Sequence, residues 1–240
     1  MKMKRIFLTI ILSTIFVRAF ACSCGSMKIT NTYSILDFIG IVEFKNLTEL
    51  KNSYGIYKTT FELKELFKGK VNEKIFVDSM KGSSCSFIPE KNRKYLIFGY
   101  KNKDGKIMTS FCLAQGNPDK KSLSILRYLK KKKIGNEISS NLRQTLRNKI
   151  NSNLFEKSVN GIFLYKVVLD SNLKFKEILP NNKNAQRNFS EKIKKELEAK
   201  ISYELNEKDK GIKNEKFISY IILTWEKNYE NERIITTTRL

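Results

Sequence analysis

The first half of the chain carries short apolar segments separated by polar or glycine-containing turns, a pattern that predicts β-strands. Five such segments follow one another, each rich in β-branched and aromatic residues: 37–44, 57–67, 74–79, 94–100 and 106–112. The pair Asp104-Gly105 lies between the last two segments, which predicts a hairpin. Gly40 lies inside the first segment and suits a strongly bent strand.

A helix is expected directly after these strands. Asn117 is a suitable N-cap and Pro118 a suitable first helical residue. Apolar residues then recur at helical spacing up to the lysine run at 130–133, namely Leu123, Leu126 and Leu129. Five short strands and one flanking helix suit a small closed barrel such as the OB-fold. We therefore expect a barrel domain at 22–133.

The second half predicts a separate, smaller domain. Residues 134–158 are polar and basic, and apolar residues at helical spacing predict a linker helix or hinge: Leu142, Leu146 and Ile150. Between 159 and 240 the expected elements are two strands, a helix and a last strand, at 162–169, 173–179, 191–201 and 217–225. The expected fold class is thus mainly β plus α+β, a five-stranded OB-fold barrel with a flanking helix followed by a small ββαβ domain.

Residues 1–21 are predicted to be a secretory signal peptide. A basic start is followed by an apolar run at 6–17 and by the A-x-A cleavage site Ala19-Phe20-Ala21. The run is shorter than the roughly 20 residues of a membrane-spanning helix. A buried N-terminal helix and a lipid anchor on Cys22 are the alternatives, but Phe20 is bulky for a lipoprotein signal. We expect cleavage to leave Cys22 at the N-terminus of a secreted protein, extracellular or in the periplasm or cell envelope.

The four cysteines, Cys22, Cys24, Cys85 and Cys112, predict disulfides in that oxidising compartment. A bridge from Cys22 to Cys24 would close a very small ring against normal disulfide geometry. Each is therefore expected to pair with one of the other two, and both such pairings are open on the residues alone. A thiolate metal site or redox pair is the alternative, which the absence of histidine and of a second close-spaced cysteine pair disfavours.

The chain contains no histidine, which excludes Ser-His-Asp triads, Cys-His dyads and His-ligated metal sites. The carboxylates that could act instead, such as Glu62, Glu65 and Asp78, form no recognisable acid–base pair in the sequence. We therefore expect that the protein is not an enzyme and that it binds no cofactor.

The chain is strongly basic, with 46 Lys and Arg against 24 Asp and Glu and a formal net charge of +22. The densest basic clusters are Lys130–Lys133 and residues 192–195. One interpretation is a surface for anionic partners such as lipid headgroups or acidic glycans. The alternative is solvated helix faces. Nucleic acid is not an expected partner of a secreted, disulfide-bonded barrel.

Several short motifs occur in a characteristic order after the Cys22-Ser23-Cys24 start: ELFKG, SSCSF, RKYLIFGY and TSFC. Together they resemble, over about residues 22–133, the netrin-like module of the tissue inhibitors of metalloproteinases (TIMPs) in its bacterial form. The resemblance implies a five-stranded OB barrel with bridges Cys22–Cys85 and Cys24–Cys112. The chain departs from the animal inhibitors in lacking their third bridge and in having Gly25-Ser26 where they carry a proline.

In that family the α-amino group and carbonyl oxygen of the first cysteine chelate the catalytic zinc of the protease. The resemblance assigns this metal-binding role to Cys22 and the specificity-pocket role to Ser23, with Cys24 holding the wedge rigid. It also implies a second contact segment at Gly82, Ser83 and Ser84. The expected function is inhibition of a zinc metalloprotease. The alternative is a non-catalytic envelope or surface adaptor that binds another extracytoplasmic protein.

The order ββαβ and the hairpin sequence LDSNLKFKEI resemble the C-terminal domain of TonB-type proteins. An unrelated small α+β domain is the alternative.

Overall fold

The computed structural model describes residue 24 and residues 29–71, 74–134, 138–139, 142–156, 161–205, 216–227 and 233–237. The predicted signal peptide, Cys22 and Ser23 lie outside the described residues. By its internal contacts the chain divides into two units. Among the described residues, Cys24 and 37–118 form the first unit, and 29–36 and 119–237 form the second.

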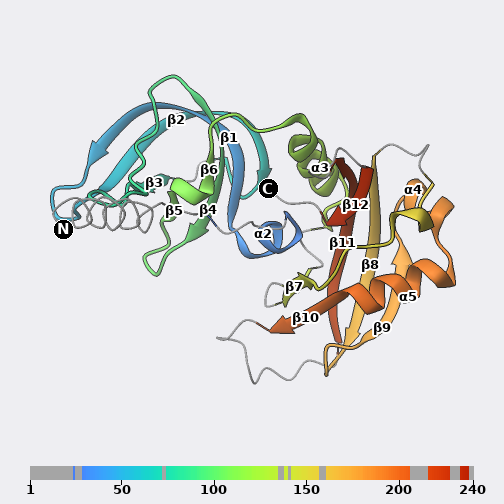
Figure 1. Ribbon diagram of the computed structural model, residues 1–240. Helices are drawn as coiled ribbons and strands as arrows, with labels where there is room; N and C mark the ends of the chain where they lie inside the picture. The colour runs from blue at the N-terminus through green and yellow to red at the C-terminus, as the bar shows by residue number, and fades with distance from the viewer. Residues whose placement is uncertain are drawn as a thin grey trace, which may run out of the picture. The chain divides into compact units, whose positions relative to one another are not determined.

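The first unit is a closed barrel (Figure 1). Its five strands are β1 (Phe38–Glu49), β2 (Ile56–Lys68), β3 (Ile75–Asp78), β4 (Lys94–Lys101) and β5 (Ile107–Ser110). They are ordered β1-β2-β3-β5-β4, and β4 pairs back onto β1 to close the barrel. The β3–β5 pairing is parallel, and the other pairings around the barrel are antiparallel. The predicted five-stranded OB-fold barrel is confirmed. The short strand β6 (Ala114–Gln115) extends the sheet beside β4.

Alternate side chains of the strands fill the barrel interior, as the period of two along a strand requires. Fully or almost fully buried there are Phe38, Val42, Phe44, Ile75, Val77, Tyr95, Ile97 and Ile107. Gly40 lies where β1 shifts its register against β2. A Cβ atom at this position would lie 3.0 Å from the backbone oxygen of Glu65. Glycine is therefore the residue that lets β1 bend between its two partner strands.

The second unit contains a four-stranded antiparallel sheet of order β12-β11-β8-β9. Its strands are β8 (Ile162–Asp170), β9 (Phe175–Pro180), β11 (Lys216–Lys227) and β12 (Arg233–Thr237). Between β9 and β11 the chain forms α4 (Lys183–Asn188), α5 (Glu191–Lys200) and β10 (Ile201–Leu205). The predicted ββαβ order is present, with α4, β10 and β12 in addition.

Helix α5 covers one face of this sheet (Figure 1). Its buried Ile193 and Leu197 belong to one core with inward-facing residues of β8 and β11, including Phe163 and Ile221. The Ser190 side chain accepts a hydrogen bond from the Ile193 N–H, which satisfies an orphan donor of the first turn. The helix starts where the sequence predicts it.

Helix α2 (Ile29–Ile35) belongs to the second unit, although it precedes the barrel in the chain. It lies against β11, and its Ile29 and Tyr33 are buried, as is Leu36 directly after it. The second unit is therefore completed by a segment from the N-terminal end of the chain.

Helix α3 (Lys120–Lys131) also groups with the second unit, whereas the sequence placed it with the barrel. Its N-cap is Asp119 and not the predicted Asn117, because the Asp119 carboxylate accepts hydrogen bonds from the backbone N–H and the hydroxyl of Ser122. Pro118 thus precedes the helix. The division between the two units lies between Pro118 and Asp119, whereas the sequence predicts that the barrel domain ends at Lys133.

The predicted linker helix within 134–158 is wrong. Residues Leu142–Leu146 form strand β7, which pairs with β10 in antiparallel register. Leu142 and Gln144 are buried on one face of this strand, and Ile150 lies in the same core. In the part of the chain that the structure describes, no helix has the length and apolarity needed to cross a lipid bilayer.

Candidate functional site

A disulfide ties Cys24 to Cys112 in the first unit, with the two Cα atoms 5.4 Å apart. Cys112 lies in a single 3-10 turn, Phe111–Leu113, which follows β5 directly. Cys24 itself is exposed. The bridge spans 88 residues of sequence, so the chain is anchored to the barrel two residues after the predicted N-terminus. This pairing agrees with the one that the TIMP resemblance implies.

Cys85 is also disulfide-bonded. It lies in the loop between β3 and β4, together with the predicted contact residues Gly82, Ser83 and Ser84. The structure exposes all three of these residues on a tight turn. Gly82 has φ +87, and no heavy atom lies within 4 Å of the position that a Cβ would take. Cys22 and Ser23, the other predicted site residues, lie outside the described residues.

Hydrogen bonds hold this turn in shape. The Ser83 hydroxyl donates to the Met80 carbonyl (2.7 Å) and accepts from the Cys85 N–H (3.2 Å). At the base of the loop, the Phe87 N–H donates to the carbonyl oxygen of Ser79 at 2.9 Å. Ser79 is fully buried, and its N–H bonds to the Gly55 carbonyl. The exposed turn is therefore braced internally and fixed to the barrel.

An aromatic contact joins the loop to the 3-10 turn that carries Cys112. The Phe87 and Phe111 rings meet edge to face with centroids 6.3 Å apart, and Phe87 also packs against Tyr95 of β4. From the sequence, Cys85 and Cys112 were connected only by the disulfide pairing that the TIMP resemblance implies, which assigns each of them to a cysteine of the N-terminal segment. The structure brings the turns that carry these two cysteines together through their aromatic neighbours.

A second contact connects the same loop to the turn between β1 and β2. The Lys81 ammonium pairs with the Glu49 carboxylate at 3.2 Å and lies 4.8 Å from the centre of the Tyr54 ring. The Gly55 N–H also donates to Glu49 at 2.9 Å. This backbone hydrogen bond, followed by the Lys81 ammonium, lowers the pKa of Glu49. This contact is not predictable from the sequence, because the two turns are about thirty residues apart and no local pattern links them.

Large apolar side chains surround these turns on the outside of the barrel unit. Tyr54 is 76% exposed and Ile88 is 52% exposed, and Met80 and Phe111 are exposed as well. Exposed aromatic and methionine side chains are enriched where proteins contact one another. A further side-chain cluster on β1 and β2 pairs Glu43 and Glu62 with Lys45 and Lys64, so its carboxylates are occupied by ion pairs.

No group of three or more Cys, Asp or Glu side chains within the described ranges is placed to ligate a metal ion. What the arrangement offers is a braced, exposed contact surface next to a disulfide-anchored chain segment. No protein-family model matches the chain, and no curated protein matches it either.

Proposed function

We propose that the protein is a secreted inhibitor of a zinc metalloprotease, acting through the α-amino group of Cys22 after removal of residues 1–21. The observation that carries this proposal is the bridge between the exposed Cys24 and Cys112, which anchors the chain to a closed barrel two residues after Cys22. A wedge whose conformation is fixed in advance loses little entropy on binding.

The chemistry requires a neutral amine. An α-amino group titrates with a pKa of about 8, so part of the population can bind zinc at neutral pH. The amine nitrogen and the carbonyl oxygen of Cys22 would occupy two positions on the protease zinc and displace its water. The Ser23 side chain would enter the neighbouring pocket of the protease, and the exposed Gly82–Ser84 turn would add a second contact.

The test compares the native secreted protein with two altered N-termini, one acetylated on the Cys22 amine and one extended by a single alanine. Both alterations leave the disulfides and the barrel unchanged. We expect both to lose at least about a hundredfold in affinity for a metalloprotease that the native protein inhibits, because one metal ligand is removed or displaced. Equal inhibition by the native and acetylated forms excludes zinc chelation by Cys22.

An adaptor without inhibitory activity is the second candidate. The exposed Tyr54, Met80 and Ile88 side chains favour it, because they would serve protein contact without any metal chemistry. If neither form of the protein inhibits any member of a panel of secreted metalloproteases, the adaptor is the better account. An intact-mass measurement of secreted protein then shows whether the Cys22 amine is free at all.

A further inference from the structure

Helix α3 presents one face to the protein and the opposite face to solvent. The buried face consists of Ser122, Ile125, Leu126 and Leu129. Lys120, Arg127 and Lys131 lie opposite, at positions i, i+7 and i+11, which fall on one line along a helix. All three are exposed, and so are Lys130, Lys132 and Lys133 at the end of the helix. We call these six residues the α3 basic face.

The α3 basic face contains no acidic residue. No Asp or Glu occurs between Lys120 and Ile134, whereas the whole chain carries about one acid for every two cations. Within the described residues, neither Lys120 nor any of Lys130–Lys133 forms an ion pair with a carboxylate. Helix α5 differs in this respect. Its ten residues contain four lysines but also three acidic residues, Glu191, Glu196 and Glu198. A generally basic composition therefore does not account for α3.

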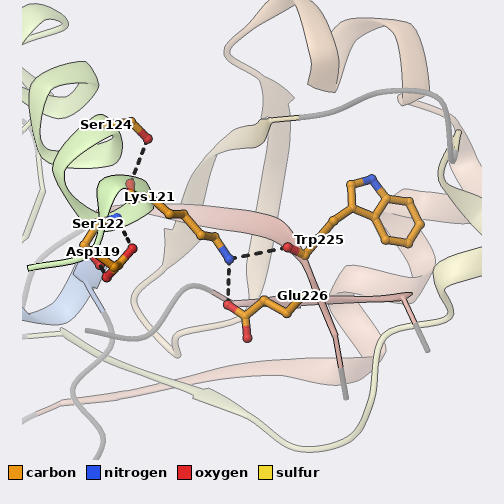
Figure 2. Close-up of polar contacts among 6 residues, drawn as sticks. All are labelled: Asp119, Lys121, Ser122, Ser124, Trp225 and Glu226. Carbon is orange, nitrogen blue, oxygen red and sulfur yellow. Dashed lines mark hydrogen bonds and ion pairs between the residues drawn. The ribbon is translucent and has the colours of Figure 1, made fainter. Parts of the chain in front are cut away.

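Polar contacts define where α3 begins and where it is attached to the sheet (Figure 2). The Asp119 carboxylate caps the first turn through Ser122. The Lys121 ammonium points toward β11, where it donates to the Glu226 carboxylate at 2.8 Å and to the Trp225 carbonyl at 3.4 Å. One lysine of the helix is thus used to attach it to the sheet. The apolar face of the helix is buried and Lys121 is bound to β11, so the outer cations are left exposed together.

We propose that the α3 basic face binds the surface of a bilayer that contains anionic phospholipid. This interaction is independent of the Cys22 mechanism. None of the six residues is apolar, and no large apolar side chain of α3 is exposed, so the face has nothing to insert into the hydrocarbon. A layer of anionic headgroups requires only closely spaced cations on an open surface, and α3 supplies them. Binding by charge alone must weaken steeply as salt is added.

The experiment is sedimentation of the full-length secreted protein with vesicles. One set contains phosphatidylcholine with about a third phosphatidylglycerol, and the other contains phosphatidylcholine alone. We expect binding to the first set at low salt, loss of that binding at high salt, and none to the second. Each surface lysine strengthens such binding about fivefold, so the quadruple variant K130Q/K131Q/K132Q/K133Q should bind at least about a hundredfold more weakly.

The matched control is K192Q/K194Q/K195Q/K200Q on α5, which removes the same number of positive charges from another helix. It should keep most of the binding, because its lysines lie among glutamates. Equal weakening by the two variants would mean that net charge alone acts, and this overturns the proposal. Unchanged binding by the α3 variant overturns it as well. Tighter binding to a soluble sulfated polymer than to vesicles of equal charge also overturns the proposal, because the partner is then an acidic polymer and not a membrane. Equal thermal midpoints verify that both variants are folded.

Discussion

The ring of Phe87 packs edge to face against the ring of Phe111, with centroids 6.3 Å apart. Phe87 lies two residues after Cys85, and Phe111 directly precedes Cys112. The pair therefore connects the two turns that carry disulfide-bonded cysteines of the barrel. It fixes the Gly82–Ser84 turn relative to the anchor of the N-terminal segment.

Replacing Phe87 by alanine should destabilise the barrel. The ring is partly buried against Tyr95 and Phe111, so we expect a loss of about 2 kcal/mol in the free energy of unfolding. Urea denaturation of the oxidised protein measures it. Ile88→Ala is the control, because Ile88 is 52% exposed and its truncation should cost less than about 0.5 kcal/mol. Equal effects of the two substitutions would contradict the role of the aromatic contact.

Replacing Ile29 by alanine should destabilise the second unit and leave the barrel intact. Ile29 is fully buried on α2, and α2 lies against β11. We expect a loss of about 2–4 kcal/mol. The single tryptophan, Trp225, lies on β11, so its fluorescence follows the unfolding of this unit.

The control for that substitution lies on the same helix. Ile35 is 46% exposed, and Ile35→Ala should shift the Trp225 transition little. If Ile29→Ala leaves the Trp225 transition where it is, α2 does not belong to the second unit.

Adding one methyl group at Gly99 should strain the barrel. A Cβ at this position would lie 2.4 Å from Cγ2 of Ile107, whose side chain is fully buried and has little room to move. We expect Gly99→Ala to cost about 1–3 kcal/mol in urea denaturation. At Gly116 the nearest atom is the end of the flexible Arg93 side chain, at 3.2 Å. Gly116→Ala should therefore be nearly neutral, and a cost equal to that of Gly99→Ala would argue against the close contact.

The second unit should lose stability in alkaline solution. Burial raises the pKa of Tyr203 from 10.0 to about 12. Above about pH 10 the unfolded chain releases a proton that the folded chain keeps, so the free energy of unfolding falls between about pH 10 and 12. Two pH units correspond to roughly 3 kcal/mol. Burial also raises the pKa of Tyr165, which adds a decline of the same sign.

Urea denaturation followed by Trp225 fluorescence at a series of pH values measures this decline. Tyr203→Phe removes one ionisable group. The slope of the unfolding free energy against pH should then be smaller by the contribution of about one proton. The variant starts from lower stability at neutral pH, because the Gln144 amide loses its hydrogen bond to the Tyr203 hydroxyl. An unchanged slope in the variant would show that Tyr203 ionises equally in both states.

Local patterns were sufficient to predict the barrel strands. The alternation of apolar and polar residues is visible within each strand segment on its own. In the predicted turn Asp104-Gly105, Gly105 has a φ of +74, which glycine adopts readily. The Gly82–Ser84 turn was named only as the second contact segment that the TIMP resemblance implies. The contact of Lys81 with Glu49 could not be predicted, since it depends on how two loops meet in space.

Strand β7 was mistaken for a helix for a definite reason. Leu142, Leu146 and Ile150 are four residues apart, and a spacing of four fits both the helical period and the strand period of two. The residue that decides between them is Gln144. It is polar, yet it is buried beside Leu142, and its side chain donates to the Tyr203 hydroxyl at 2.8 Å. Only the pairing with β10, about sixty residues later, accounts for a buried amide there.

The membership of α2 in the second unit has a consequence for the order of folding. All barrel strands lie between residues 38 and 110, so the barrel can form once the first half of the chain has been made. Helix α2 contacts β11, which begins only at Lys216, and also β7. Contacts this distant in sequence form slowly, because a long loop has to close first. Until β11 has been synthesised, the sheet that α2 lies against is incomplete, and the buried side chains of Ile29 and Tyr33 lack part of their packing.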